Sequence, residues 1–268
     1  MVWLKLNFMK KIKIGIYGSE GRMGRDIISR ATKFKEIEVS FLCEHSKHSS
    51  IGKKNLDLIV SSNIKDLIHN SDVIIDFTNA KGTLFLLGSI KKSKDKPAII
   101  TGTTGFSKSE ESKFLELKKG LKVLRSFNMS LGVNLMKSIV KTCSKNLVDL
   151  ADVEIVEIHH NRKKDIPSGT AITLGESIKE GNQKFKRFTF REKNNDRVRV
   201  KNEIGFSSIR GGNVVGEHSV YFFMGGETIK LTHIANDRKV FSEGALRAAV
   251  WIKKQKIGFY STTDMLKI

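Results

Sequence analysis

The segment from Glu157 to Ala171 combines residues that can donate protons with residues that can bind anions. Adjacent imidazoles stand at His159 and His160, at the end of a predicted strand. Histidine is the usual proton donor near neutral pH, and a hydride added to a C=N or C=C bond leaves negative charge that a proton must quench. Because neighbouring side chains at a strand end diverge, both imidazoles reach one ligand only if the chain bends there.

The second half of this segment is suited to carboxylates. Lys163 and Lys164 supply positive charge, and Ser168-Gly169-Thr170 opens a predicted helix whose first N–H groups can bind an anion. Taken singly, such lysines are usually solvated and such a turn is usually a plain helix cap. Their concentration in one segment with the histidines favours a dicarboxylate pocket with an acid beside it. The carboxylates show no metal-binding spacing, so no metal is expected.

A glycine-rich turn, Gly18-Ser19-Glu20-Gly21-Arg22-Met23-Gly24, lies between a predicted strand and a predicted helix. In dinucleotide-binding folds, glycines at this position let the backbone approach the pyrophosphate, which binds at the helix N-terminus. Glu44, at the end of the second predicted strand, is placed to accept hydrogen bonds from the adenine-ribose hydroxyls. The alternative is a plain tight turn with a solvated glutamate.

Three further polar loops end predicted strands: Asp76-Phe77-Thr78, Thr101–Gly105 and Ser126–Ser130. Ligands of open α/β sheets bind at this carboxyl edge, so the small polar groups there are suited to the nicotinamide ring. Glu44 favours NADH by repelling a ribose 2′-phosphate. The basic residues that follow it favour NADPH, and they are His45, Lys47 and His48. The sequence therefore does not decide between the two cofactors.

The composition of the 268-residue chain restricts its class. Lys and Arg total 48 against 28 Asp and Glu, a net charge of +20. A basic nucleic-acid or membrane surface is one explanation, but the basic residues are scattered along the chain rather than clustered. Two distant cysteines indicate no disulfide framework, and no apolar run approaches the roughly 18 residues of a membrane span. The opening residues look like a short extension before Met9, without a signal peptide, and a cytoplasmic location is expected.

The first half of the chain alternates predicted strands and helices. Strands are predicted at Lys11–Tyr17, Val39–Cys43, Val73–Phe77, Ala98–Thr101 and Val123–Leu124. Helices are predicted after the glycine turn, near 80–92 and near 108–119. This alternation is typical of a parallel, doubly wound sheet with helices on both faces.

The pattern changes after about residue 130. The sequence first predicts a long helix over Val133–Leu147, a strand over Val153–His159 and a helix from Thr170. Residues 182–202 are predicted to form a surface loop or edge strand. Three antiparallel strands joined by glycine turns follow, and a helix over Ser242–Lys254 is expected to pack on the first domain; the strands are Ile204–Ile209, Val214–Phe223 and Thr228–Ala235.

The predicted fold class is therefore α/β. It combines a Rossmann-type doubly wound parallel sheet domain with a smaller α+β domain that has an open mixed or antiparallel sheet. The first domain, residues 1–130 completed by 240–268, is assigned to dinucleotide binding. The second, residues 131–239, is assigned to substrate binding and oligomerisation.

Over nearly its full length, the chain resembles the dihydrodipicolinate reductase family of the lysine and diaminopimelate pathway. The motifs that carry the resemblance are Gly18–Gly24, Asp76–Thr78, Gly102–Gly105, Asn128–Asn134, His159–Ala171 and Arg210–His218. The resemblance implies NADH- or NADPH-dependent reduction of a cyclic dicarboxylate to tetrahydrodipicolinate, by a homotetramer built through the sheet of the second domain.

The resemblance also implies roles for individual residues. Catalytic proton transfer falls on His159 and Lys163, and substrate binding on His160, Gly169 and Thr170. The cofactor-binding positions are Gly18, Ser19, Glu20, Gly21, Arg22, Met23, Glu44, His45, Gly102, Thr103, Thr104, Ser126, Phe127, Asn128 and Met129.

Three residues depart from the family pattern. Phe127 stands where proline or alanine is common, Ile166 where alanine is common, and His45 where an arginine often meets the 2′-phosphate. Two other functions would account for part of the sequence. Another two-domain Rossmann dehydrogenase would not need the His159–Ala171 string, and a non-catalytic cofactor-sensing or nucleic-acid-binding protein would explain the charge but not that string.

Overall fold

The computed structural model describes residues 10–190 and 197–267. The predicted N-terminal extension and part of the 182–202 segment lie outside these ranges. The chain divides into two compact units: one runs to Met129 and includes Phe241–Met265, and the other comprises Ser130–Val240 with the end of the chain.

The first unit is built on an eight-stranded sheet. Its strand order is β13-β7-β6-β5-β1-β2-β4-β3, and all pairs are parallel except the antiparallel pair β3–β4. Successive strands extend in opposite directions from the β1–β5 pair, so the chain reverses its winding there. The strands are β1 (Ile12–Tyr17), β2 (Ile37–Cys43), β3 (Lys54–Asn55), β4 (Leu58–Ser61), β5 (Val73–Asp76), β6 (Ala98–Thr101), β7 (Lys122–Arg125) and β13 (Gly258–Tyr260).

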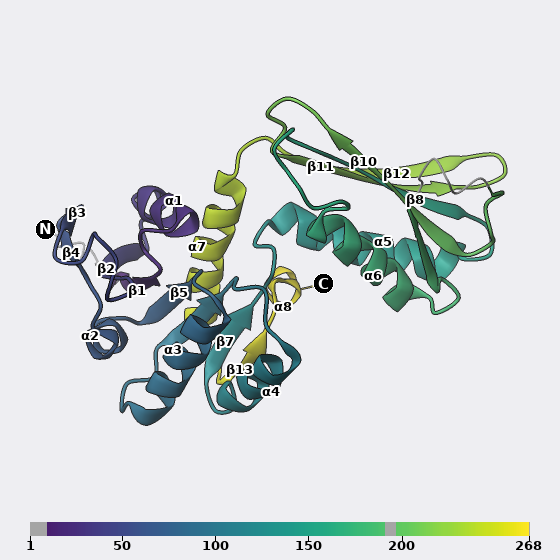
Figure 1. Cartoon of the computed structure of the whole chain (residues 1–268). Coiled ribbons are helices and arrows are strands. Elements are labelled where there is room, and N and C mark those ends of the chain that lie inside the picture. The colour runs from purple at the N-terminus through teal and green to yellow at the C-terminus, as the bar shows by residue number, and fades with distance from the viewer. Residues whose placement is uncertain (1–9, 191–196, 268) are drawn as a thin grey trace, which may run out of the picture. The chain divides into compact units, whose positions relative to one another are not determined.

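Helices cover both faces of this sheet (Figure 1). Alternating strand residues divide between two cores because successive side chains point to opposite faces: Ile75 packs with α1 and α7, and Ile74 with α2, α3 and α4. The predicted return of the C-terminal helix to the first domain is confirmed by Ala245 and Ile252 in that core. The helices are α1 (Arg22–Ala31), α2 (Ile64–His69), α3 (Ala80–Lys92), α4 (Lys108–Leu117), α7 (Lys239–Lys253) and α8 (Thr262–Leu266).

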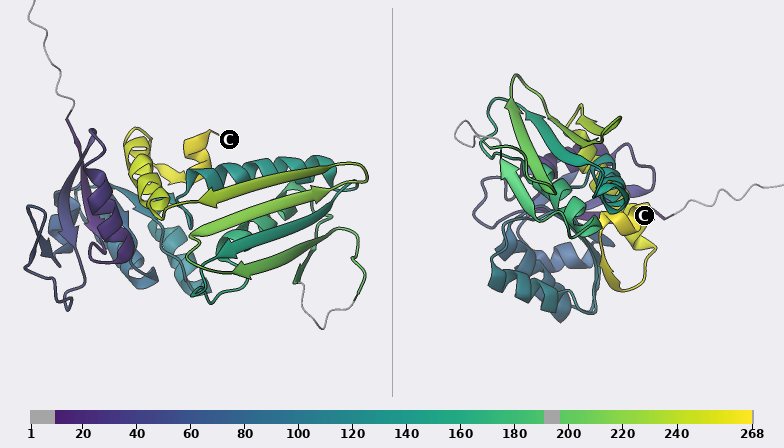
Figure 2. Two further views of the ribbon diagram at one scale, coloured as in Figure 1. Left: turned by 90° about the horizontal axis from the view of Figure 1, so that it is seen from above. Right: turned by 90° about the vertical axis from the view of Figure 1, so that its right-hand side faces the viewer.

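The second unit is a five-stranded mixed sheet with two helices on one face (Figures 1 and 2). Along β8, Val153 and Ile155 face α5 and α6, and the alternate residues face away. The sheet order is β12-β11-β8-β10-β9. The elements are α5 (Leu131–Leu147), β8 (Asp152–His159), α6 (Gly169–Gly181), β9 (Arg187–Phe190), β10 (Glu203–Arg210), β11 (Gly216–Phe223) and β12 (Thr228–Ala235).

One prediction about this sheet is wrong. The sequence predicted an antiparallel run of β10, β11 and β12, but only β11 and β12 form such a pair. Strand β8 lies between β10 and β11, parallel to the first and antiparallel to the second. The chain connects β10 to β11 past the end of β8, where Gly211 donates from its N–H to the carbonyl of His159 (3.0 Å). The α/β fold class itself is confirmed.

No helix within residues 10–190 and 197–267 is both long and apolar enough to cross a membrane. Cys43 and Cys143 are both free thiols.

Candidate active site

The turn after β1 has the backbone geometry that a phosphate-binding loop requires. Gly18 has φ +83°, a left-handed conformation that glycine adopts without strain. A Cβ on Gly24 would lie 2.2 Å from the carbonyl oxygen of Gly18, so the helix packs too closely on the turn for a side chain there. Gly21 is the N-cap of α1 and has no side-chain oxygen to occupy the N–H groups of the first turn. Arg22 and Met23 begin the helix.

Glu44 lies just after β2 and is fixed beside this turn. Its Oε2 accepts a hydrogen bond from the N–H of Glu20 (3.0 Å), and its Oε1 accepts one from the N–H of His45 (2.9 Å). Glu20 in turn accepts one from the amide nitrogen of Asn55 (3.0 Å). Both acids therefore border the turn, and the exposed imidazole of His45 follows directly.

A buried carboxylate at the end of β5 organises the neighbouring loops. Burial raises the pKa of Asp76, and hydrogen bonds from threonines oppose that rise. The threonine hydroxyls that donate to Asp76 belong to Thr78, Thr83, Thr101 and Thr103. The predicted loop from Gly102 to Thr104 is thereby tied to the end of β5.

The loop after β7 is held by its own contacts. Ser126 donates from its hydroxyl to the carbonyl oxygen of Asn128 (2.6 Å), and Met129 is buried in the core. Phe127 is 64% exposed, yet its ring lies over the guanidinium of Arg125 at 4.7 Å. This cation–π contact restrains the aromatic ring that departs from the family pattern.

These loops all follow carboxyl ends of parallel strands, and they flank the β1–β5 reversal where open α/β sheets bind ligands. Among the described residues, the Ser19 hydroxyl is buried without a hydrogen-bond partner. A close-approach glycine turn, an uncapped helix N-terminus and a fixed ribose-side acid suit a dinucleotide. The residues present therefore fit the cofactor that the sequence predicts.

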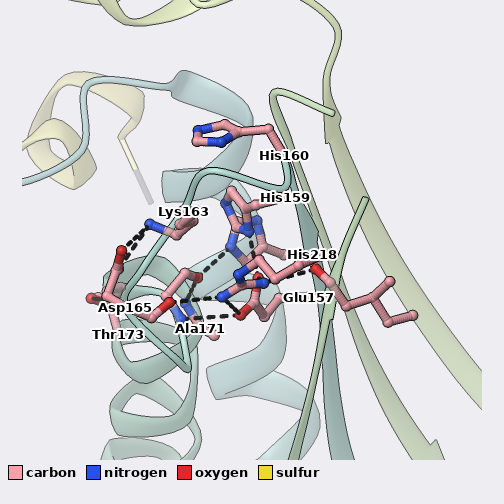
Figure 3. A network of polar contacts seen from close by, with 12 residues as sticks. Glu157, His159, His160, Lys163, Asp165, Ala171, Thr173 and His218 are labelled. Carbon is pink, nitrogen blue, oxygen red and sulfur yellow. Dashed lines mark hydrogen bonds and ion pairs between the residues drawn. The ribbon is translucent and has the colours of Figure 1, made fainter. Parts of the chain in front are cut away.

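In the second unit, a buried carboxylate orients the first histidine (Figure 3). The alternation of β8 puts Glu157 and His159 on the same face, and Glu157 Oε2 contacts Nδ1 of His159. Burial holds the pKa of His159 below its usual value, although Glu157 opposes this shift. Burial also opposes ionisation of Glu157, but hydrogen bonds, chiefly from Arg210, hold the pKa of that carboxyl below its usual value. An ionised Glu157 only accepts, so Nδ1 carries a proton.

The carboxylate turn joins the same cluster. Ser168 donates from its N–H to Glu157 Oε1 (3.2 Å), and its hydroxyl accepts from the N–H of Ala171 (3.2 Å) as the N-cap of α6. Gly169 is the first residue of α6, and a Cβ there would meet no atom within 4 Å. Thr170 follows in the first turn. The predicted acid and the predicted anion turn are thus linked through one buried carboxylate.

His160 and Lys163 make different contacts from His159. His160 projects away from the Glu157–His159 pair, and its Nε2 lies 3.3 Å from Nη2 of Arg238 (Figure 3). Burial first, and Arg238 next, lower the pKa of His160. Lys163 donates to both carboxylate oxygens of Asp165, at 2.8 and 2.7 Å.

One group of described residues has ligand atoms close enough for a metal: Glu157, His159 and His218, with these atoms within 4.8 Å of one another. Both oxygens of Glu157 accept hydrogen bonds from Arg210, however. The guanidinium already supplies the positive charge at this carboxylate. A cation would have to displace it, so the group does not fit a metal site.

The sequence did not identify Glu157, Arg210, Arg238 or His218 as site residues. For Glu157 a signal was available, because a carboxylate at every-second-residue spacing from Val153 interrupts the apolar face of a strand. The other three reach the site through pairing of distant strands and loops, for which the sequence carries no local signal.

Two family profiles match the chain: "Dihydrodipicolinate reductase, N-terminus" over residues 12–129 and "Dihydrodipicolinate reductase, C-terminus" over residues 132–266. The 4-hydroxy-tetrahydrodipicolinate reductase of Aquifex aeolicus is 40% identical over 264 residues, covering 95% of this chain and 98% of that protein. The protein of the same name from Pelagibacter ubique is 39% identical over 260 residues, covering 96% and 99%.

A solved structure has the same fold. The dipicolinate-bound dihydrodipicolinate reductase from Paenisporosarcina sp. TG-14 superposes with a TM-score of 0.77 at 20% identity, covering 96% of this chain and 99% of that one. Family profiles match both halves of the sequence, and the relatives match along nearly their whole length. The chain belongs to the dihydrodipicolinate reductase family.

Proposed function

We propose that this chain reduces 4-hydroxy-tetrahydrodipicolinate to tetrahydrodipicolinate with NADH or NADPH, in lysine and diaminopimelate biosynthesis. The relatives that carry this activity in their names support the proposal. The observation that carries it furthest within the chain is the Glu157–His159 pair beside the anion turn at Ser168. This arrangement joins a proton donor to a carboxylate-binding element.

On this proposal, the first unit holds the cofactor, which supplies the hydride when bound. The N-terminus of α1 at Gly21 takes the pyrophosphate, and Glu44 takes the adenine ribose. The loops Gly102–Thr104 and Ser126–Met129 border the nicotinamide. The fixed Glu44 supports NADH and the basic residues after it support NADPH, so both remain in the proposal.

The second unit binds the substrate and supplies the proton. Nδ1 of His159 is engaged by Glu157, so Nε2 is the ring nitrogen that exchanges a proton with a ligand. Gly169 and Thr170 take one substrate carboxylate at the N-terminus of α6. Lys163 and His160 complete the site, with Lys163 leaving Asp165 to meet the substrate or supply a proton.

We further propose a homotetramer built through the second unit. The face of its sheet turned away from α5 and α6 carries apolar side chains, including Ile234 at 54% exposure. Exposed apolar clusters of this kind mark protein–protein contacts. The others on this face are Val156, Ile158, Ile209, Tyr221 and Phe223. Light scattering of the purified protein measures the subunit number, and a monomer would reject this assembly.

A cytoplasmic location is part of the same proposal. Both thiols, Cys43 and Cys143, are free, as is usual in reducing compartments.

The activity is tested with enzymatically generated substrate, following the absorbance of reduced nicotinamide with NADH and NADPH in turn. Cofactor oxidation that requires the substrate is the expected result. No oxidation with either cofactor, by a protein that binds NADH, would reject the proposed reaction.

A further inference from the structure

Glu157 is fully buried, and both of its carboxylate oxygens accept hydrogen bonds from neighbouring groups. Arg210 donates through Nη1 to Oε2 (2.9 Å) and through Nη2 to Oε1 (2.7 Å). The N–H of Ser168 donates to Oε1, and Nδ1 of His159 contacts Oε2. Removing such partners from a buried carboxylate costs free energy. The charge-assisted hydrogen bonds therefore hold Glu157 in a fixed position.

Arg210 connects the same carboxylate to the loop that carries Lys163. Its Nη2 also donates to the carbonyl oxygen of Asp165 (2.7 Å). In the sheet, Arg210 pairs directly with His159 across the parallel β8–β10 ladder. One guanidinium on β10 therefore anchors the acid on β8 and the loop between β8 and α6.

We propose that Glu157 and Arg210 are positioning residues for proton transfer: Glu157 holds the Nδ1–H tautomer of His159, leaving Nε2 to react, and Arg210 holds Glu157. The inference rests on the proposed reductase function. In the reaction, the Nε2–H bond of protonated His159 breaks as the substrate atom next to the hydride-accepting carbon gains that proton. A neutral imidazole with hydrogen on Nδ1 remains.

The charges around His159 show why the carboxylate matters. The titratable and charged groups that face the ring are Glu157 on β8, Arg210 on β10, His218 on β11, and Lys163 in the loop after β8. Of these, Glu157 alone is negative. Its charge raises the pKa of His159, whereas burial and the cations Lys163 and Arg210 lower that pKa. Gly216 leaves space at the reacting edge, since a Cβ there would lie 3.0 Å from Nε2.

The test compares Glu157→Gln with a matched control on the same strand, Glu154→Gln. Glu154 also pairs with an arginine, Arg199, but points to the opposite face of the sheet. The full chain is labelled with ¹³C and ¹⁵N at histidine, and NMR follows the tautomer and titration of His159, assigned with His159→Asn. In parallel, kcat is measured against pH.

We expect Glu157→Gln to mix the two tautomers of His159 and to shift its titration to lower pH. At neutral pH, kcat falls about 10- to 100-fold. The pH above which kcat declines also moves down, and affinity for NADH is unchanged. Glu154→Gln keeps the wild-type tautomer, titration and rate. Unchanged tautomer and titration in folded Glu157→Gln would overturn the proposal.

If Glu157→Gln fails to fold, Arg210→Lys replaces it, because lysine keeps the charge but loses the two-pronged contact. It should move the titration in the same direction by a smaller amount, and no movement would again overturn the proposal. The NMR readout needs no turnover. A protein without reductase activity but with the expected tautomer change would therefore reject the proposed function and leave the positioning role standing.

Discussion

Ser168 Oγ lies 2.8 Å from Nε2 of His218, which ties the N-cap of α6 to strand β11. The ring of His218 also packs edge-to-face against His159, with centroids 5.0 Å apart. Burial, and then the charge of His159, lower the pKa of His218 to about 3. His218 is therefore neutral at physiological pH, and it supports the acid beside it without repelling the proton that His159 must carry.

The depressed pKa of His218 predicts a loss of stability on mild acidification. The unfolded chain protonates this imidazole near pH 6.5, whereas the folded chain does not until about pH 3. The contribution of neutral His218 to the free energy of unfolding is complete above pH 6.5. It declines as the pH falls from 6.5 towards about 3. Between about pH 7 and pH 5, wild type should lose roughly 2 kcal/mol more unfolding free energy than His218→Gln. Urea unfolding at the two pH values measures the free energy of unfolding of both proteins. Equal losses in wild type and His218→Gln would contradict a neutral buried His218.

Glu44 should control the choice between the two cofactors. Its carboxylate is fixed by the N–H groups of Glu20 and His45, so a ribose 2′-phosphate would meet its charge. Glu44→Gln should raise the KM for NADH relative to that for NADPH by about tenfold, or about 1.4 kcal/mol. Glu38→Gln, at the exposed far end of β2, is the control. Equal changes for both cofactors would show that Glu44 does not face the ribose.

Lys163 should act on the substrate and not on the cofactor. Its ammonium is held by Asp165 within the loop that precedes the anion turn. Lys163→Ala removes this charge and should lower kcat/KM for the substrate by at least about tenfold, with NADH affinity unchanged. Lys164→Ala is the matched control, because this neighbouring lysine is exposed. Steady-state kinetics and fluorescence titration compare the two, and equal effects would remove Lys163 from the site.

Local patterns were sufficient to predict most of the fold. The run of apolar residues that includes Ile74 and Ile75 predicted β5, whose side chains pack into helical layers on both faces, and the turn at Gly18 precedes α1 as expected. In both cases the signal is contained in a few consecutive residues, because strand burial and tight turns depend on nearest neighbours. The same holds for the helix that begins at Gly169.

Long-range pairing could not be predicted in this way. No local pattern records that β8 separates β10 from β11, and the register that sets Arg210 beside His159 joins residues far apart in the sequence. The sequence therefore predicted the acid and the anion turn, but not the guanidinium and the imidazole that surround them. The stacking of Phe127 on Arg125 is local in sequence, yet it depends on how the loop after β7 folds back.

On the proposed mechanism His159 delivers the proton to the substrate, and the variant that probes this step is His159→Gln. The variant and a control, His69→Gln at an exposed position on α2, are compared for kcat and for the Kd of NADH. We predict that kcat falls at least about 100-fold in His159→Gln while the Kd for NADH stays the same. A kcat close to that of the control, or a kcat loss matched by an equal loss of NADH affinity, would contradict the account.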